Sequence, residues 1–318
     1  MKDSMIFAAD IGGTTVKLGL FLADGTLKEK WEIPTRTENK GANILPDVAA
    51  AIRAKMTVEG IAPEQVLGIG IGVPGPIDAN SVAITGCDNL GWDRVDVKGE
   101  MNALLPEVPN VCAGNDANVA ALGEAWLGGG KGHRNSVLFT LGTGVGGGVI
   151  LDGRILAGHN GAAGELGHMP VNPDETIPCG CGKCGCLEQY ASATGMARLA
   201  REALAACDTP SPLRKLEQVT AKDVCDNARQ GDPLSLAVLD RFADYLGRGM
   251  SFACCAVDPE VIMVGGGVSR AGDVLLDPVR RAFRKYAYHT CVNTPIVAAQ
   301  LGNDAGICGC AAMVLGIR

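Results

Sequence analysis

Residues 5–21 read MIFAADIGGTTVKLGLF and contain the clearest structural signal in the chain. Met5 to Asp10 is an apolar run that ends in an acid, and the turn-forming cluster Gly-Gly-Thr-Thr follows at 12–15. Val16 to Phe21 then alternates apolar side chains with other residues. Apolar strands on both sides of a glycine turn predict a β-hairpin. Glycine also lets backbone N–H groups approach an anion closely, so the turn is a candidate phosphate site.

A second hairpin is predicted near the middle of the chain. Its strands are Ser136 to Leu141 and Gly147 to Leu151, and Gly142 to Gly146 joins them. A Gly-Thr turn after an apolar strand therefore occurs twice, which suggests two lobes of similar plan.

Strands and helices alternate through the rest of the sequence, which predicts an α/β fold. Further strands are expected at Leu27 to Ile33, Val66 to Val73, Val111 to Ala113 and Val261 to Val264, and helices at Ile44 to Thr57, Ala120 to Leu127, Gly195 to Ala206 and Leu234 to Ala256. We expect an N-terminal lobe over 1–113, with 302–318 packing back on it, and a C-terminal lobe over 114–301.

Composition limits the classes of partner. The 318 residues are 47% hydrophobic and 20% charged, which is typical of a globular protein with a substantial core. The net charge of -7 argues against nucleic acid or an anionic membrane as a partner. Met1 to Asp10 lacks the pattern of a signal peptide, and no apolar run is long enough to span a bilayer. We therefore expect a cytoplasmic protein that binds small molecules and keeps most of its 13 cysteines as reduced thiols.

Three glycine turns could together hold a nucleotide, although each alone is compatible with an ordinary tight turn. The first turn has Asp10 available to bind Mg²⁺ through water, and the third follows a buried strand and could lie against an adenine ring. None matches the P-loop pattern, so a different nucleotide-binding fold is required. The candidate MgATP-binding residues are Asp10, Gly12, Gly13, Thr14, Thr15, Gly142, Thr143, Gly144, Gly265, Gly266 and Gly267.

The chain resembles the ROK-family sugar kinases of the actin-like ATPase superfamily, and most of all the bacterial ROK glucokinases. The matching motifs extend over essentially the whole chain and are Asp10 to Lys17, Gly72 to Gly75, Gly114 to Asn118, Leu141 to Gly148 and Gly265 to Gly267. The resemblance implies a two-lobed actin-like ATPase fold, phosphorylation of a hexose by ATP, and a homodimer or homotetramer.

A compact group of cysteines predicts an inserted zinc-binding knuckle. Ten residues separate His168 from Cys179, and Cys181, Cys184 and Cys186 follow at short intervals. Three thiolates and one imidazole fill the tetrahedral shell of Zn²⁺, which makes such a site structural. The resemblance assigns the ligands to His168, Cys179, Cys181 and Cys186. A site made of the four cysteines, and a redox role for them, are alternatives.

The resemblance also implies the groups that bind the sugar. They are Gly75, Asn89, Asn115, Asp116, Glu165, His168 and Glu188. Asp116 is expected to be the general base that takes the proton of the sugar hydroxyl. Without the resemblance, Asp116 is better explained as an ordinary helix cap, and a solvated surface charge is an alternative explanation of Glu165.

Several other functions share these motifs. Fructose, allose, N-acetylmannosamine and N-acetylglucosamine are alternative substrates within the resemblance. ROK relatives also include sugar-sensing repressors, which are disfavoured because the first strand is predicted to begin at about Met5. An inactive sugar-binding subunit is disfavoured because Asp10 and Asp116 are both present.

Overall fold

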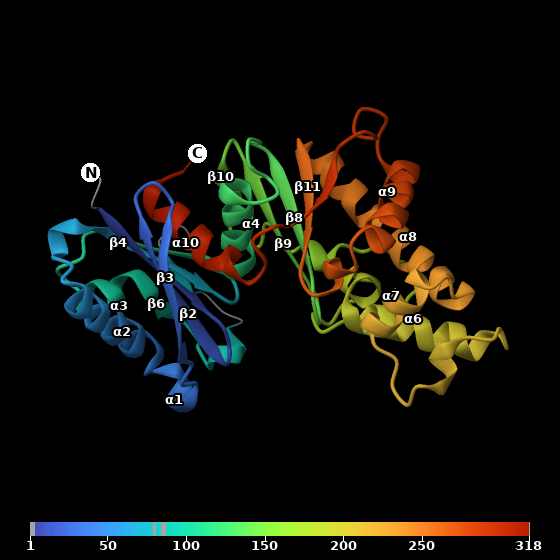
Figure 1. Ribbon diagram of the computed structural model, residues 1–318, viewed down its shortest axis with the longest axis horizontal. Coiled ribbons are helices and arrows are strands. Elements are labelled where there is room, and N and C mark those ends of the chain that lie inside the picture. Colours follow the sequence, from blue (N-terminus) through green and yellow to red (C-terminus); the bar gives the residue numbers. More distant parts are fainter. Residues whose placement is uncertain (1–3, 79–80, 84–86, 318) are drawn as a thin grey trace. The chain divides into compact units, whose positions relative to one another are not determined.

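The computed structural model describes residues 4–78, 81–83 and 87–317. The chain divides into two compact units, each of which combines a sheet with helices (Figure 1). Unit 1 comprises residues 1–134, 148–164 and 303–318, and unit 2 comprises residues 135–147 and 165–302. The predicted lobe boundaries at 113/114 and 301/302 stay a prediction.

Unit 1 contains a five-stranded sheet in the order β3 (Leu27–Pro34), β2 (Thr15–Leu22), β1 (Met5–Ile11), β4 (Val66–Val73) and β7 (Val111–Asn115). The first three strands are antiparallel, whereas β1, β4 and β7 run parallel. Asp10 pairs with Gly72, which in turn pairs with Gly114. The carboxyl ends of the three parallel strands therefore meet at one edge of the sheet.

Helices cover both faces of this sheet. Alternate residues of β1, including Phe7 and Ala9, share a buried core with α2 (Ile44–Glu59) and α3 (Val97–Leu104). The opposite face packs against α10 (Ala305–Leu315), which also lies along α4 (Asp116–Leu127) (Figure 1). The contact with β4 is close, because a Cβ atom added at Gly70 would lie 2.6 Å from the Cys310 carbonyl carbon.

The second sheet has the order β10 (Arg154–Ile155), β9 (Val145–Leu151), β8 (Ser136–Leu141), β11 (Val261–Gly265) and β12 (Ile296–Ala298). Strands β8, β11 and β12 are parallel. The helices of unit 2 are α5 (Glu188–Ala191), α6 (Ala193–Ala206), α7 (Ala221–Arg229), α8 (Pro233–Val257) and α9 (Asp273–Tyr286). The remaining elements are α1 (Glu38–Gly41), the strand pair β5 (Val82–Ala83) and β6 (Val95–Asp96), and short 3₁₀ turns.

Both predicted hairpins are confirmed, with β9 beginning at Val145 rather than Gly147. The predicted helices are also present, and each differs from its expected bounds by one to four residues at its ends. Among the described residues, no helix has the length and apolar character that crossing a membrane requires.

Candidate active site

The parallel strands of unit 1 bring two acidic residues to one edge of the sheet. Asp10 lies near the end of β1 in register with Gly114 of β7, two strands away. Asn115 ends β7, and Asp116 is the first residue of α4. Adjacent strands lie about 4.8 Å apart, so the backbones of β1 and β7 are separated by about 10 Å at this edge. Ligands of open α/β sheets bind at such carboxyl ends.

The surroundings of the Asp10 carboxylate favour the binding of a cation. Within the described part of the chain, this carboxylate makes no hydrogen bond. Burial raises the pKa of Asp10, and the nearby positive charge of Lys17 opposes that shift only in part. A half-buried carboxylate that makes no hydrogen bond is costly, and a hydrated Mg²⁺ would supply both charge and hydrogen-bond donors.

The turn between β1 and β2 is closed by its own backbone. The Gly12 N–H donates to the Thr15 carbonyl at 3.0 Å, and the Thr35 hydroxyl donates to the Gly12 carbonyl at 2.7 Å. Asn89 lies beside this turn, since a Cβ atom added at Gly13 would be 3.6 Å from the Asn89 Cβ. Asn89 is exposed, so its amide can reach a ligand.

Asn115 and Asp116 both accept hydrogen bonds from backbone N–H groups at the start of α4. The Asn115 side-chain oxygen accepts from the Asn118 N–H at 3.0 Å, and its Nδ2 donates to the Gly75 carbonyl at 3.1 Å. Asp116 Oδ1 accepts from the Ala117 N–H at 2.7 Å. Asn115 is therefore the N-cap residue, as its φ and ψ also show. Asp116 lies in the first turn, where the positive end of the helix favours an ionised carboxylate.

In unit 2, the turn Gly142–Gly144 is held by the residues that follow the cysteine motif. The Ala193 N–H donates to the Gly142 carbonyl at 2.8 Å, and the Thr194 hydroxyl donates to the Thr143 carbonyl at 2.8 Å. The Val145 N–H donates to Glu188 Oε2 at 2.9 Å. The turn is thus fixed by side chains and backbone from α5 and α6.

A cavity of about 550 Å³ opens beside this turn. It is lined by Gly142 and Thr143, by Gly267, by Val268 and Arg270 of the following 3₁₀ turn, and by residues of α7. Gly266, next to the lining residue Gly267, takes a φ of +83°, and a Cβ atom there would lie 2.6 Å from the Leu141 backbone. Glycine is therefore required where the chain leaves β11, beside the end of the parallel strand β8.

Charged residues of α7 border the same cavity. Asp226 pairs with Arg229 at 2.9 Å and with Lys222. The Arg229 Nη2 donates to the Ala271 carbonyl at 2.9 Å, which links α7 to the segment after β11. The lining therefore combines apolar atoms with fixed polar groups, as small-molecule sites do.

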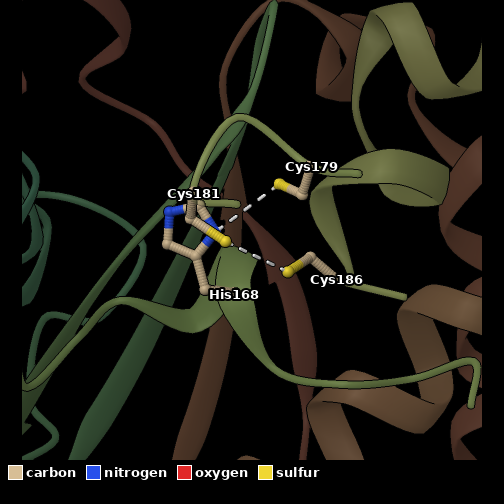
Figure 2. A group of neighbouring side chains, drawn as sticks. All are labelled: His168, Cys179, Cys181 and Cys186. Atoms are coloured by element: carbon tan, nitrogen blue, oxygen red, sulfur yellow. Dashed lines mark hydrogen bonds between the residues drawn. The ribbon is translucent and has the colours of Figure 1, made fainter. Parts of the chain in front are cut away.

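Four side chains in unit 2 converge on one point (Figure 2). The ligand atoms of His168, Cys179, Cys181 and Cys186 all lie within 4.8 Å of one another. His168 Nδ1 lies 3.9 Å from the Cys179 sulfur, and the Cys181 and Cys186 sulfurs are 3.6 Å apart. This donor set of three thiols and one imidazole fits tetrahedral Zn²⁺. Cys184 is outside the group, and its sulfur donates instead to the Thr176 carbonyl at 3.7 Å.

Two predicted sugar ligands adjoin this cluster. Glu188 Oε1 lies 3.7 Å from the Cys179 sulfur, and Glu165 Oε2 lies 3.9 Å from His168 Nε2. The His168 ring is thus placed with Nδ1 toward the cysteines and Nε2 toward Glu165. His168 can therefore bind a metal through Nδ1 and orient the Glu165 carboxylate through Nε2.

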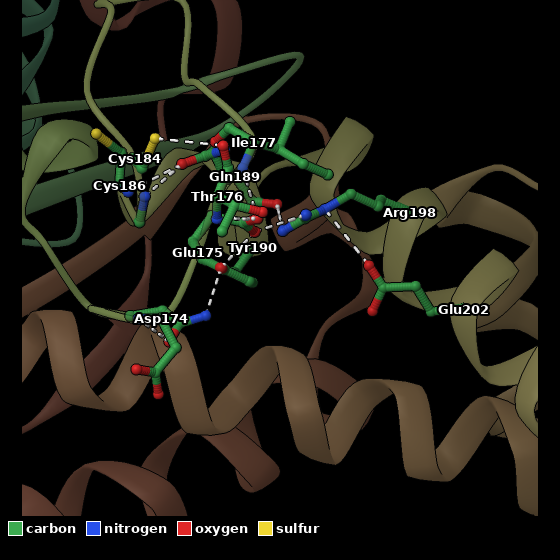
Figure 3. A network of polar contacts seen from close by, with 12 residues as sticks. Asp174, Glu175, Thr176, Ile177, Cys184, Cys186, Gln189, Tyr190, Arg198 and Glu202 are labelled. Atoms are coloured by element: carbon green, nitrogen blue, oxygen red, sulfur yellow. Dashed lines mark hydrogen bonds and ion pairs between the residues drawn. The ribbon is translucent and has the colours of Figure 1, made fainter.

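A polar network holds the loop that carries these cysteines (Figure 3). Glu175 accepts from the Tyr190 hydroxyl at 2.6 Å and from Arg198 at 2.7 Å. Gln189 accepts from the N–H groups of Gly185 and Cys186 and donates to the Ile177 carbonyl at 2.8 Å. Residues of α5 and α6 thereby hold the middle of the loop at Glu175 and Ile177 and its C-terminal end at Gly185 and Cys186.

The sequence did not indicate every residue that shapes these regions. Thr220, Lys222, Arg229 and Arg270 line the cavity, and Glu175, Gln189, Tyr190 and Arg198 hold the cysteine loop. Only Thr220 carries a recognisable signal, a capping box with Asp223 at the start of α7. The others become neighbours through tertiary packing.

Comparison with known proteins agrees with the geometry. Residues 6–317 match the model of the ROK family. The chain is 41% identical over 315 residues to a glucokinase of Halalkalibacterium halodurans, covering 97% of this chain and 94% of the relative. It is 37% identical over 320 residues to a glucokinase of Thermotoga maritima, covering 99% and 98%.

A solved structure extends the comparison to the fold. The ROK family glucokinase of Streptomyces griseus, crystallised in complex with glucose and AMPPNP, is 33% identical to this chain. The two superpose with a TM-score of 0.76 over 98% of this chain and 99% of that one. The chain therefore belongs to the ROK family and has the fold of its sugar kinases.

Proposed function

We propose that this chain transfers the γ-phosphoryl group of MgATP to the C6 hydroxyl of glucose and so forms glucose 6-phosphate and ADP. The observation that carries the proposal is the placement of Asp116 in the first turn of α4, at the sheet edge that also bears Asp10. The relatives support it, because two of them are named glucokinases and a third was solved with glucose and an ATP analogue.

Unit 1 supplies the chemical groups of the proposed reaction. Asp116 orients the C6 hydroxyl and accepts its proton as the oxygen attacks phosphorus, and the bond to the ADP oxygen breaks in line. Asn115 and Asn89 bind the sugar, as does the backbone at Gly75. Asp10 holds the waters of Mg²⁺, while the N–H groups of the Gly12 to Thr15 turn and the threonine hydroxyls bind phosphate oxygens. When bound, Mg²⁺ neutralises charge on the phosphates.

Unit 2 supplies the proposed nucleotide pocket and further sugar ligands. The cavity beside Gly142 and Thr143 has the size and lining for an adenosine group, with the glycines at 265–267 against the ring. Thr143 and Gly144 contribute N–H groups toward the phosphates. Glu165, His168 and Glu188 bind sugar hydroxyls, since carboxylates and imidazole accept and donate the bonds that such hydroxyls need.

We propose that Zn²⁺ is bound by His168, Cys179, Cys181 and Cys186 and is structural. A full shell of four protein ligands leaves no position for substrate, so Zn²⁺ would supply rigidity to the loop and no chemistry. The residues around it would then orient His168 and Glu188. A cytoplasmic location and a homodimeric or homotetrameric state stay predictions.

The experiment is a comparison of kcat/KM for glucose, fructose, allose, N-acetylmannosamine and N-acetylglucosamine with purified protein and MgATP. The proposal expects glucose to be preferred and the product to carry phosphate on C6. A higher kcat/KM for an N-acetyl sugar would replace the substrate assignment. Absence of phosphoryl transfer to every sugar would reject the kinase proposal itself.

A further inference from the structure

A glycine occupies the first turn of α10, where alanine would stabilise the helix. The residue is Gly306, and it is buried. The helix begins without a side-chain cap, since Asp304 at the N-cap position pairs with Lys30 instead. The N–H groups of this turn therefore present uncapped positive charge.

The space that a side chain at position 306 would need is filled by Asp10. The three nearest atoms to a Cβ added at Gly306 all belong to the Asp10 carboxyl group. Its Cγ would lie 2.6 Å away and Oδ1 3.1 Å away, with Oδ2 closer still. Real Cβ atoms are essentially never found closer than 3.0 Å to another heavy atom, so a larger residue at position 306 must displace the carboxylate.

Gly72 forms the opposite wall. It pairs with Asp10 in the sheet, and a Cβ added there would lie 3.2 Å from Oδ1. The fit on this side is tight but less severe.

The other close glycine contacts of α10 have a different cause. A Cβ added at Gly309 would lie 2.6 Å from the Val119 carbonyl carbon, and one at Gly123 would lie 2.8 Å from the Gly309 N. These contacts are between backbones and allow α10 and α4 to pack closely. Within α10, the obstruction at position 306 consists of a functional side chain, whereas the nearest atoms at position 309 belong to the backbone.

We propose that Gly306 is a positioning residue, which leaves room for the Asp10 carboxylate over the first turn of α10 and so fixes where it meets the Mg²⁺ of MgATP. The function of that carboxylate rests on the proposed kinase activity, but its contact with Gly306 does not. The first turn adds to the positive charge of Lys17 in stabilising the ionised form of this half-buried carboxylate. Helix α10 is thereby connected to the phosphate turn at the end of β1.

A double-mutant cycle on the stability of the full chain tests the contact without reference to activity. Gly306→Ala is expected to lower the thermal midpoint in the wild-type background and to leave it unchanged or raise it in the Asp10→Ala background. Ala312→Gly, later in the same helix, is the matched control and should have the same effect in both backgrounds. An equal loss from Gly306→Ala in both backgrounds would overturn the proposal.

A folding failure would still be informative. If Gly306→Ala alone is unfolded, the proposal requires Asp10→Ala/Gly306→Ala to be folded. An unfolded double variant, with Asp10→Ala alone folded, would show that the glycine serves packing only.

The Mg²⁺ dependence of phosphoryl transfer tests the consequence for function. Groups that orient a metal ligand typically change metal affinity by about 10-fold or more when altered, so Gly306→Ala should raise the half-saturating Mg²⁺ concentration by about 10-fold. Gly72→Ala should have a smaller effect in the same direction, and KM for glucose should change little. A folded Gly306→Ala protein with wild-type Mg²⁺ dependence would contradict the positioning role. If the wild type transfers no phosphate, the kinase proposal fails and the stability cycle still decides the contact.

Discussion

The Glu188 carboxylate accepts a hydrogen bond from the Val145 backbone N–H at 2.9 Å. A Cβ atom at Gly144 would lie 3.0 Å from the Glu188 Cδ, so the carboxylate rests directly on the turn. The other oxygen of Glu188 lies 3.7 Å from the Cys179 sulfur. One side chain thus connects the proposed zinc knuckle with the proposed phosphate turn.

Replacing Glu188 should therefore affect both substrates. Loss of a hydrogen bond to a charged group costs about 1.5 to 3 kcal/mol, so Glu188→Ala should lower kcat/KM for ATP by about 10- to 100-fold, with a loss for glucose as well. Glu188→Gln keeps an acceptor for the Val145 N–H and should lose less with ATP. Steady-state kinetics with each substrate varied would measure this. An unchanged KM for ATP in Glu188→Ala would show that the contact with the turn is irrelevant.

Metal analysis should distinguish Cys184 from the other cysteines of the knuckle. The wild type should contain about one zinc per chain, as a closed four-ligand site requires. Cys184→Ser should keep that content, because its sulfur contacts the Thr176 carbonyl and lies outside the cluster. Cys186→Ser should lose most of the metal and a large part of the thermal stability. Loss of zinc from Cys184→Ser would favour a site of four cysteines.

Glu175 should give the stability of unit 2 a dependence on acid. Hydrogen bonds from Tyr190, from the Ile177 backbone and from Arg198 lower the pKa of Glu175 from 4.5 to about 2. A carboxylate whose pKa is depressed by folding stabilises the fold above its unfolded pKa, and that contribution is lost as the pH falls through the folded value.

The test compares the wild type with Glu175→Gln. At neutral pH the variant should melt at a lower temperature, and the gap should narrow as the pH falls below 4.5 and close only as the pH reaches about 2. Thermal melts across that range would show this, with zinc content followed in parallel. A gap that stays constant with pH would mean that the ionised carboxylate contributes nothing.

Asp10→Asn should raise the thermal stability of the protein and lower its phosphoryl-transfer activity. Burial raises the pKa of Asp10, so its ionised form destabilises the fold at pH values above the ordinary 3.8. The amide removes that cost, and the thermal midpoint at neutral pH should rise. Phosphoryl transfer should fall by about 100-fold, because the ligand for the hydrated Mg²⁺ loses its charge. A variant that is both less stable and fully active would contradict the assignment.

The two hairpins could be predicted because their signals are local. Apolar runs flank Gly-Thr turns at both places, and the same logic located the strand that ends at Gly265. The four clustered metal ligands were also recognisable, since His168 and three cysteines lie within 19 consecutive residues. A site whose residues lie close together in the sequence can be predicted with little knowledge of the tertiary structure.

The contacts that shape the site could not be predicted in the same way. Gly306 and Asp10 lie at opposite ends of the chain, and nothing in either sequence context points to the other. Gln189 holds the knuckle through backbone N–H groups, which leave no mark in a sequence. The role of Asn115 as the cap, which leaves Asp116 in the first turn, was likewise decided by backbone geometry.

The central claim is that Asp116 accepts the proton of the sugar hydroxyl, and Asp116→Asn tests it most directly. Asparagine preserves the size of the side chain and removes its basicity. A general base contributes about 100- to 10,000-fold, so kcat with glucose and MgATP should fall by at least about 100-fold while the thermal midpoint and zinc content stay close to wild type. A kcat within a few-fold of the wild-type value would contradict the account.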